Sequence, residues 1–318
     1  MKLFTNFTPK QRISIWMIIS TFTFIFCSIS IVNHYLFRTE AFDLGVYNNM
    51  IYSYSHFKFN YTTIQQPNVW HAFSDHFEPI FFLFAPIYYL LGSYTLLYIQ
   101  IAMITIGGIG MMLWVKQITE NNNLAIAILF QFFSMWGIYS ALSFDFHNNV
   151  TAAMLIPWLA LFIHQQQWKK MVIVWLLMLA CKENMALFTS FVCAGFAMHY
   201  FNEPSKRNKL LFLSIISFIY FLLVIKVIIP YFQLSGNGYL YNDMHKTLGN
   251  TPSEIIDNVI NRPGYLFAHL FENFLDSHAY NGIKSETHFA VLISGGIFLV
   301  YRPQFLIMLI PIYVQKNV

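Results

Sequence analysis

The chain has 318 residues, of which 57% are hydrophobic and only 10% are charged. Soluble domains carry roughly 25% charged residues, so this composition excludes a typical water-soluble domain. The net charge is only +4, and Lys and Arg cluster between apolar runs, which is typical of membrane topology and gives no indication of nucleic-acid binding. The three cysteines are interpreted as packing residues, since all lie in apolar runs: Cys27, Cys181 and Cys193.

The N-terminal segment predicts an uncleaved first membrane span. Residues 1–12 carry Lys2, Lys10 and Arg12, and the mostly apolar run 13–32 follows directly. A cleaved signal peptide has a shorter apolar core and a small-residue cleavage site, and this run has neither. Since basic residues stay on the cytoplasmic side of a membrane, we expect the N-terminus in the cytoplasm.

Later apolar runs are of two kinds. Four approach the length that crosses a bilayer, about twenty residues, and lie at 94–115, 124–142, 148–164 and 210–229. Three others are irregular. Residues 79–91 are apolar but short, 171–200 is interrupted by Lys182 and Glu183, and 289–314 is broken by Arg302 and Pro303.

Basic residues between the runs predict the topology. If 10–12, 116, 169–170 and 206–209 all face the cytoplasm, 33–115 crosses the membrane once and 171–200 goes out and back. Broken helices of this kind occur where backbone lines a protein cavity. We therefore predict one all-α integral membrane domain, a polytopic transmembrane helical bundle with broken helices. Its expected parts are the cytoplasmic N-terminus 1–12, a first span 13–32, a helical first external loop 33–78, a helical core 79–229, an external loop 230–288 and a C-terminal hydrophobic segment 289–318.

This topology brings charged residues from four segments to the non-cytoplasmic side. Charged groups at membrane depth are costly and often mark functional cavities. The residues are Asp43; Asp75, His76 and Glu78; Asp145 and His147; and Lys182 and Glu183.

The first two of these segments have a functional and a structural interpretation. Asp43 begins an amphipathic stretch, where a carboxylate serves as general base or metal ligand, or as a helix N-cap. Asp75, His76 and Glu78 stand directly before Pro79. They suit a metal or acid–base cluster, or the carboxylates complement the dipole of a helix with Pro79 in its first turn.

The last two segments leave the same choice open. Asp145 and His147 are two residues apart, so both can reach one site, or they belong to an ordinary polar loop. Lys182 either holds a phosphate as a point charge or pairs with the adjacent Glu183.

Short motifs follow one another along the chain: Phe-Asp-Leu-Gly-Val-Tyr at 42–47, Ser-Asp-His-Phe-Glu-Pro at 74–79, Ala-Pro-Ile-Tyr at 85–88, Phe-Asp-Phe-His at 144–147 and Lys-Glu-Asn at 182–184. In this order they resemble the DUF2079 family of prokaryotic membrane proteins, from about residue 35 to the end. Family members usually continue beyond the apolar run in which this chain stops, so we expect a fragment.

That family in turn resembles the C-type glycosyltransferases, multispanning enzymes that use polyprenyl-phosphate sugars at the outer face of the membrane. The resemblance implies transfer of a sugar to an acceptor, with Asp43 as the catalytic acidic residue of the first external loop. It also implies a substrate site and, with a divalent cation, a metal site. The expected substrate-binding residues are Tyr47, Glu78, Lys182 and Glu183, and the expected metal ligands are Asp75, His76, Asp145 and His147.

The resemblance implies a multi-pass protein of a prokaryotic inner (cytoplasmic) membrane, with polyprenyl-phosphate and membrane lipids as partners and no nucleic acid. Two other functions stay open. Broken helices with nearby charges are also typical of secondary transporters, although the sequence has no internal repeat. The second is a non-catalytic lipid-binding membrane protein, which would share the fold of the glycosyltransferases and lack their transfer activity.

Overall fold

The computed structural model describes residues 4–39, 42–62, 70–233, 252–272 and 282–316. The chain divides into two compact units, Met1–Met185 and Ala186–Val318, which are described separately. Nearly all of the regular structure is helical, as the sequence predicts. The exception in the described ranges is a pair of two-residue strands, β1 (Tyr61–Thr62) and β2 (Trp70–His71), which pair antiparallel.

The first unit begins with the long helix α1, Pro9–Tyr35. Its start follows from a capping box: the Thr8 side chain accepts the Gln11 N–H, and the Gln11 side chain accepts the Thr8 N–H at 3.0 Å. Pro9 at the first helical position needs no hydrogen-bond acceptor for its nitrogen. The predicted span 13–32 is therefore helical, and the helix continues beyond it at both ends.

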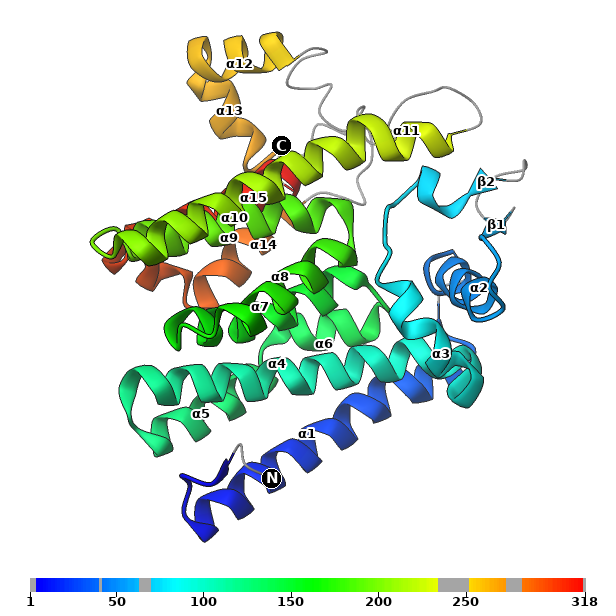
Figure 1. Cartoon of the computed structure of the whole chain (residues 1–318), viewed down its shortest axis with the longest axis vertical. Helices are drawn as coiled ribbons and strands as arrows, with labels where there is room; N and C mark the ends of the chain where they lie inside the picture. The colour runs from blue at the N-terminus through cyan, green and yellow to red at the C-terminus, as the bar shows by residue number, and fades with distance from the viewer. Residues whose placement is uncertain (1–3, 40–41, 63–69, 234–251, 273–281, 317–318) are drawn as a thin grey trace. The chain divides into compact units, whose positions relative to one another are not determined.

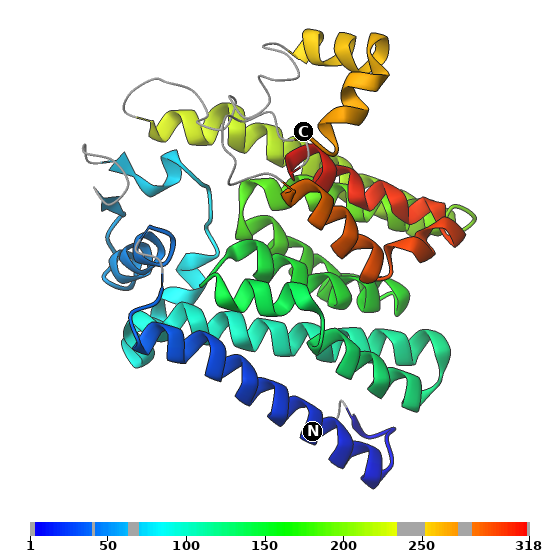
Figure 2. The same ribbon diagram turned by 180° about the vertical axis from the view of Figure 1, so that it is seen from behind.

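The remaining helices of this unit follow in chain order. They are α2 (Asp43–Ser55), α3 (Phe81–Leu91), α4 (Thr95–Thr119), α5 (Asn122–Phe133), α6 (Trp136–Ser143), α7 (Asn148–His164), α8 (Trp168–Cys181) and the first residues of α9 (Glu183–His199). Helices α1, α4 and α5 lie side by side in both views (Figures 1 and 2). Helix α4 also packs along α7, and α7 packs against α8.

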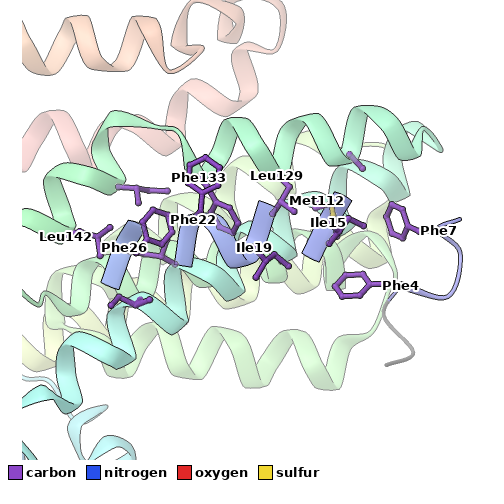
Figure 3. Close-up of a cluster of buried hydrophobic side chains, with 14 residues drawn as sticks. Phe4, Phe7, Ile15, Ile19, Phe22, Phe26, Met112, Leu129, Phe133 and Leu142 are labelled. Carbon is purple, nitrogen blue, oxygen red and sulfur yellow. The ribbon is translucent and has the colours of Figure 1, made fainter. Parts of the chain in front are cut away.

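An aromatic cluster holds α1 against α5. The ring of Phe133 lies 5.5 Å from Phe22 and 5.7 Å from Phe26, between centroids (Figure 3). Helices in a bilayer associate through close packing, which small residues permit. On α4, Gly108 faces the Phe133 ring and Gly110 faces Trp158 so closely that a Cβ at either position would overlap the ring.

The second unit contains most of α9, together with α10 (Pro204–Leu223), a π-helical turn (Val224–Ile228), α11 (Ile229–Phe232), α12 (Pro252–Asn261), α13 (Pro263–His269), α14 (Ile283–Ile293) and α15 (Ile310–Lys316). Ser190 on α9 donates to the Ser214 carbonyl of α10 at 2.9 Å. The predicted external loop 230–288 includes α12 and α13, while its segments 234–251 and 273–281 lie outside the described residues.

In the described ranges, four helical stretches are long and apolar enough to cross a membrane: Pro9–Tyr35, Phe81–Thr119, Asn122–Ser143 and Pro204–Phe232. They contain the predicted spans 13–32, 94–115 and 210–229, which are thereby confirmed as helices of membrane-crossing length. The predicted span 124–142 lies in the third stretch, but its helix is interrupted between α5 and α6. The predicted span 148–164 is the shorter helix α7, with 17 residues. The predicted break in 171–200 is also confirmed, because α8 ends at Cys181 and α9 begins at Glu183.

Candidate functional site

The candidate site is centred on Lys182, at the break between α8 and α9. Its backbone is extended, with φ −166° and ψ 153°, so the helix cannot continue through it. Both charged residues at the break are buried, with exposed fractions of 9% for Lys182 and 1% for Glu183. Buried charges require partners.

Residues 75–80, directly before α3, supply those partners. Glu183 binds two successive residues: its Oε1 lies 2.8 Å from His76 Nδ1, and its Oε2 accepts the Phe77 N–H at 3.1 Å. The Ile80 N–H donates to the Ala180 carbonyl at 2.9 Å. Segment 75–80 is therefore attached to the helix break by backbone and side-chain hydrogen bonds.

Further ion pairs complete the group that we call the buried charge cluster: Asp75, His76, Glu78, Lys182 and Glu183. The Lys182 Nζ lies 3.9 Å from Glu78 Oε1, and the His76 Nε2 lies 3.9 Å from Asp75 Oδ1. Lys182 and Glu183 thus each pair with segment 75–80.

Burial raises the pKa of Glu78 to about 7, against an ordinary value of 4.5. Lys182 and His76 oppose this rise, and Glu183 adds to it. The Asn148 amide also lowers the pKa of Glu78, although no hydrogen bond of ordinary geometry joins the two side chains. Burial alone would lower the pKa of His76, but the charge and hydrogen bond of Glu183 outweigh burial and Lys182, and the pKa is raised.

Asp43 and Tyr47 lie one turn apart on α2. The Tyr47 ring is buried and packs on Phe81 at 5.3 Å and on Phe146 at 6.0 Å, between centroids. Burial is the first cause that raises the pKa of Tyr47; the charges of Glu78, Asp75, Asp43 and Glu183 follow. The Tyr47 hydroxyl therefore lies within electrostatic range of four carboxylates, including the predicted catalytic residue.

Two of the structural interpretations are wrong in detail. Phe42, and not Asp43, occupies the N-cap of α2, and Asp43 is the first helical residue. Helix α3 begins at Phe81 with Ile80 as its N-cap, so Pro79 precedes the first turn, which contains no acidic residue. The hydrogen bonds to Glu183 and Ala180 hold segment 75–80 outside that helix.

Gln100 on α4 fixes the loop that carries Asp145 and His147. The buried Gln100 side chain donates to the carbonyls of Ala141 and Asp145 and accepts the His147 N–H at 2.9 Å. Asp145 is buried and adopts a left-handed backbone with φ +63°, which Asp tolerates better than most residues. The His147 ring stacks on Phe144 and meets the Tyr47 ring edge-on at 6.2 Å, so this loop adjoins Tyr47.

The four predicted metal ligands do not form one group. Asp75 and His76 belong to the buried charge cluster, whereas Asp145 and His147 belong to the loop held by Gln100. Within the part of the chain that the structure describes, no three His, Cys, Asp or Glu side chains are arranged to hold a metal ion. A metal-binding role for the four residues stays a prediction.

Sequence reasoning missed four buried residues with polar side chains: Gln100, Asn148, Thr151 and Tyr54. Gln100 and Thr151 are polar residues inside apolar runs, which is itself a signal of an internal partner or cavity. Asn148 directly follows the motif 144–147, and Tyr54 lies in an ordinary stretch of α2, so nothing singled them out.

Fold and site together define an all-helical, polytopic membrane protein with a buried charge cluster at a helix break. The chain belongs to the DUF2079 family of predicted membrane proteins, whose sequence model matches residues 33–317. The predicted resemblance to this family is thereby confirmed, whereas the resemblance to the C-type glycosyltransferases stays a prediction. No curated protein and no solved structure matches the chain.

Proposed function

We propose that the chain is a membrane glycosyltransferase, which transfers a sugar from a polyprenyl-phosphate donor to an acceptor hydroxyl at the non-cytoplasmic face of a prokaryotic inner membrane. The observation that supports this most is Lys182, a buried cation at a helix break, beside a carboxyl group of raised pKa. With a pKa of about 7, Glu78 is protonated in a large fraction of molecules at neutral pH and neutralises Lys182 incompletely. Lys182 then keeps positive charge for a phosphate.

The proposed reaction uses groups of the first unit. The acceptor oxygen attacks the anomeric carbon of the donor, the bond from that carbon to the phosphate oxygen breaks, and the electron pair leaves with polyprenyl phosphate. Asp43 takes the acceptor proton as general base. Lys182 stabilises the negative charge on the departing phosphate, and such electrostatic stabilisation is often the largest catalytic contribution.

The other predicted substrate residues, Tyr47, Glu78 and Glu183, position the substrates around these two groups. Tyr47 supports this arrangement, because the charges of both Glu78 and Asp43 contribute to the raised pKa of its hydroxyl. No step is assigned to a divalent cation, because the described donor groups form no metal-binding set.

The test is sugar release or transfer from a labelled polyprenyl-phosphate sugar by the purified chain. We expect Asp43→Asn to lower the rate by about 100-fold or more while the protein stays folded. Asp257→Asn is the matched control, since Asp257 is exposed on α12 and bonds Asn261. Full activity of folded Asp43→Asn would contradict the role of Asp43, and no release by wild type would contradict glycosyl transfer.

A proton-coupled secondary transporter is the second candidate. It is favoured by Glu78, a fully buried carboxyl whose pKa of about 7 lies near physiological pH, next to a broken helix. It predicts proton-driven uptake of a sugar or sugar phosphate into proteoliposomes, which Glu78→Gln abolishes and Asp43→Asn does not. Donor binding with neither release nor uptake would favour a non-catalytic lipid-binding protein.

A further inference from the structure

Glu78 and three residues of α2 and α7 carry buried polar atoms without a hydrogen-bond partner in the described part of the chain. Both carboxylate oxygens of Glu78, the amide oxygen and nitrogen of Asn148, and the hydroxyls of Thr151 and Tyr54 have no hydrogen-bond partner in the described ranges. The exposed fractions are 0% for Glu78, 1% for Asn148, 1% for Thr151 and 5% for Tyr54. Buried polar groups are normally hydrogen-bonded, so these six atoms in four residues are available to the hydrogen-bonding groups of a ligand.

These residues come from three elements: the segment before α3, helix α2 and the start of α7. The Asn148 amide is close enough to Glu78 to affect its ionisation. Burial, followed by the charge of Glu78, raises the pKa of Tyr54 on α2. Asn148 and Thr151 are three residues apart on α7, and therefore lie on one face of that helix.

The neighbouring contacts keep α7 in place without using these side chains. The backbone N–H of His147, the N-cap of α7, is bound by Gln100 at 2.9 Å. Asn148 and Thr151 are thus presented by a helix start that is already fixed, and their side chains are not needed to cap it. A site whose polar groups are positioned in advance loses little entropy when a ligand binds.

The polar atoms of these four residues suit a ligand with hydroxyl groups better than a second cation. Lys182 already lies 3.9 Å from Glu78, so another positive charge at that carboxylate would be repelled. Hydroxyl groups can donate to Glu78 and to the Asn148 oxygen, and can accept from the Asn148 nitrogen and the two hydroxyls. A sugar ring supplies several such groups next to the phosphate that Lys182 would hold.

We infer that Glu78, Asn148, Thr151 and Tyr54 form a buried subsite for the sugar hydroxyls of the lipid-linked donor. The inference rests on the proposed function and adds to it the part of the donor that is recognised. The subsite recognises the sugar by its hydroxyl groups, while Lys182 binds the phosphate whichever sugar it carries.

The test compares the binding of polyprenyl-phosphate glucose, mannose and galactose with that of unglycosylated polyprenyl phosphate, using the purified 318-residue chain in detergent. We expect wild type to bind at least one sugar lipid about tenfold more tightly than polyprenyl phosphate, as expected for hydrogen bonds to buried groups that otherwise have none. Thr151→Val, which keeps the shape and removes the hydroxyl, and Asn148→Ala should reduce this ratio towards one. Binding of polyprenyl phosphate alone should not change.

Two variants serve as controls. Thr151→Ser keeps the hydroxyl and should retain the wild-type ratio. Thr105→Val makes the matched change on α4, where the hydroxyl bonds the Ile101 carbonyl, and should retain it as well. The thermal midpoint of each variant shows whether it is folded.

The outcomes separate the two proposals. Equal binding of all four lipids by wild type, or an undiminished ratio in folded Thr151→Val and Asn148→Ala, overturns the sugar subsite and leaves water as the occupant. Asp43-dependent sugar release in the same preparations would show that glycosyl transfer survives that failure. If wild type binds none of the lipids and releases no sugar, the proposed function fails and the subsite fails with it.

Discussion

The Nδ1 atom of His76 lies 2.8 Å from Oε1 of Glu183, across 107 positions of sequence. The second carboxylate oxygen of Glu183 accepts the N–H of Phe77, the next residue. One side chain at the start of α9 therefore holds the segment before α3 against the helix break. Because Glu183 is only 1% exposed, it makes these hydrogen bonds away from bulk solvent, and its partners lose a buried acceptor when it is removed.

The first prediction concerns Glu183→Ala. We expect this change to destabilise the chain by about 1–3 kcal/mol, because the His76 ring and the Phe77 N–H lose the acceptor of their hydrogen bonds. Glu183→Gln should be milder, since its amide oxygen can still accept a hydrogen bond. Thermal unfolding in detergent measures both.

The matched control for Glu183→Ala is Glu203→Ala. Glu203 pairs with Lys206 at 2.7 Å, but its side chain is 51% exposed, so its loss should change stability by about 1 kcal/mol or less. Equal effects of the two alanine variants would mean that the contact between His76 and Glu183 contributes no more than a surface ion pair.

The second prediction is a pH dependence that originates at Glu78. Its pKa in the folded chain is about 7, raised from 4.5, so the unfolded chain releases this proton at lower pH than the folded chain. The associated stability is fully present below pH 4.5 and is lost as pH rises to about 7, by up to about 3 kcal/mol. Thermal midpoints between pH 4 and 8 should therefore fall less in Glu78→Gln than in wild type.

His76 adds a second contribution of the same sign. Its pKa is raised from 6.5, so its stabilisation is present below that value and is lost as pH rises through the higher pKa of the folded chain. The decline in His76→Gln should therefore be smaller mainly above pH 6.5. An identical slope in wild type and Glu78→Gln would contradict the raised pKa of Glu78.

The sequence was sufficient to predict the helix break, because a lysine and a glutamate inside an apolar run cannot both face lipid. It also predicted that the charged motifs lie near one another. It could not predict the pairing: His76 was assigned to a metal site, yet its ring contacts Glu183, and Lys182 contacts Glu78. Such choices depend on distances between segments about a hundred residues apart, and local patterns carry no information on them.

A second limit concerns helix breaks without charged residues. The run 124–142 was predicted as one span, but α5 ends at Phe133 and α6 begins at Trp136, with Met135 in extended backbone between them. Neither Gly nor Pro lies between the two helices, so the apolar pattern continues through the break. The break lies at Ser134, the C-cap of α5, whose hydroxyl donates to the Phe130 carbonyl at 2.9 Å.

The third prediction concerns Gln100→Leu. This change removes the donor to the Asp145 carbonyl and the acceptor of the His147 N–H, both in a loop that adjoins Tyr47. Each buried group left unsatisfied costs about 1–3 kcal/mol, and we expect faster amide hydrogen exchange at His147. Gln117→Leu, at an exposed position of the same helix, is the control and should change neither property. Protection of the His147 amide in Gln100→Leu would show that another group holds the loop.

The last prediction compares alanine substitutions at two glycines, one in a crowded place and one in open space. A Cβ on Gly108 would overlap the ring of Phe133, with Cζ 2.6 Å away, and Phe133 is fully buried against Phe22 and Phe26. Because that ring has nowhere to move, we expect Gly108→Ala to destabilise the bundle by about 1–3 kcal/mol. A Cβ on Gly137 meets nothing within 4 Å, so Gly137→Ala should instead stabilise α6, by up to about 1 kcal/mol.

Thermal midpoints of the two variants in one detergent decide this comparison. A lower midpoint for Gly108→Ala beside an unchanged or higher one for Gly137→Ala would show that close approach of α4 and α5 stabilises the first unit. The same midpoint for both variants would mean that the Phe133 ring can move aside. The contact between α1 and α5 would then tolerate a shift of the aromatic cluster.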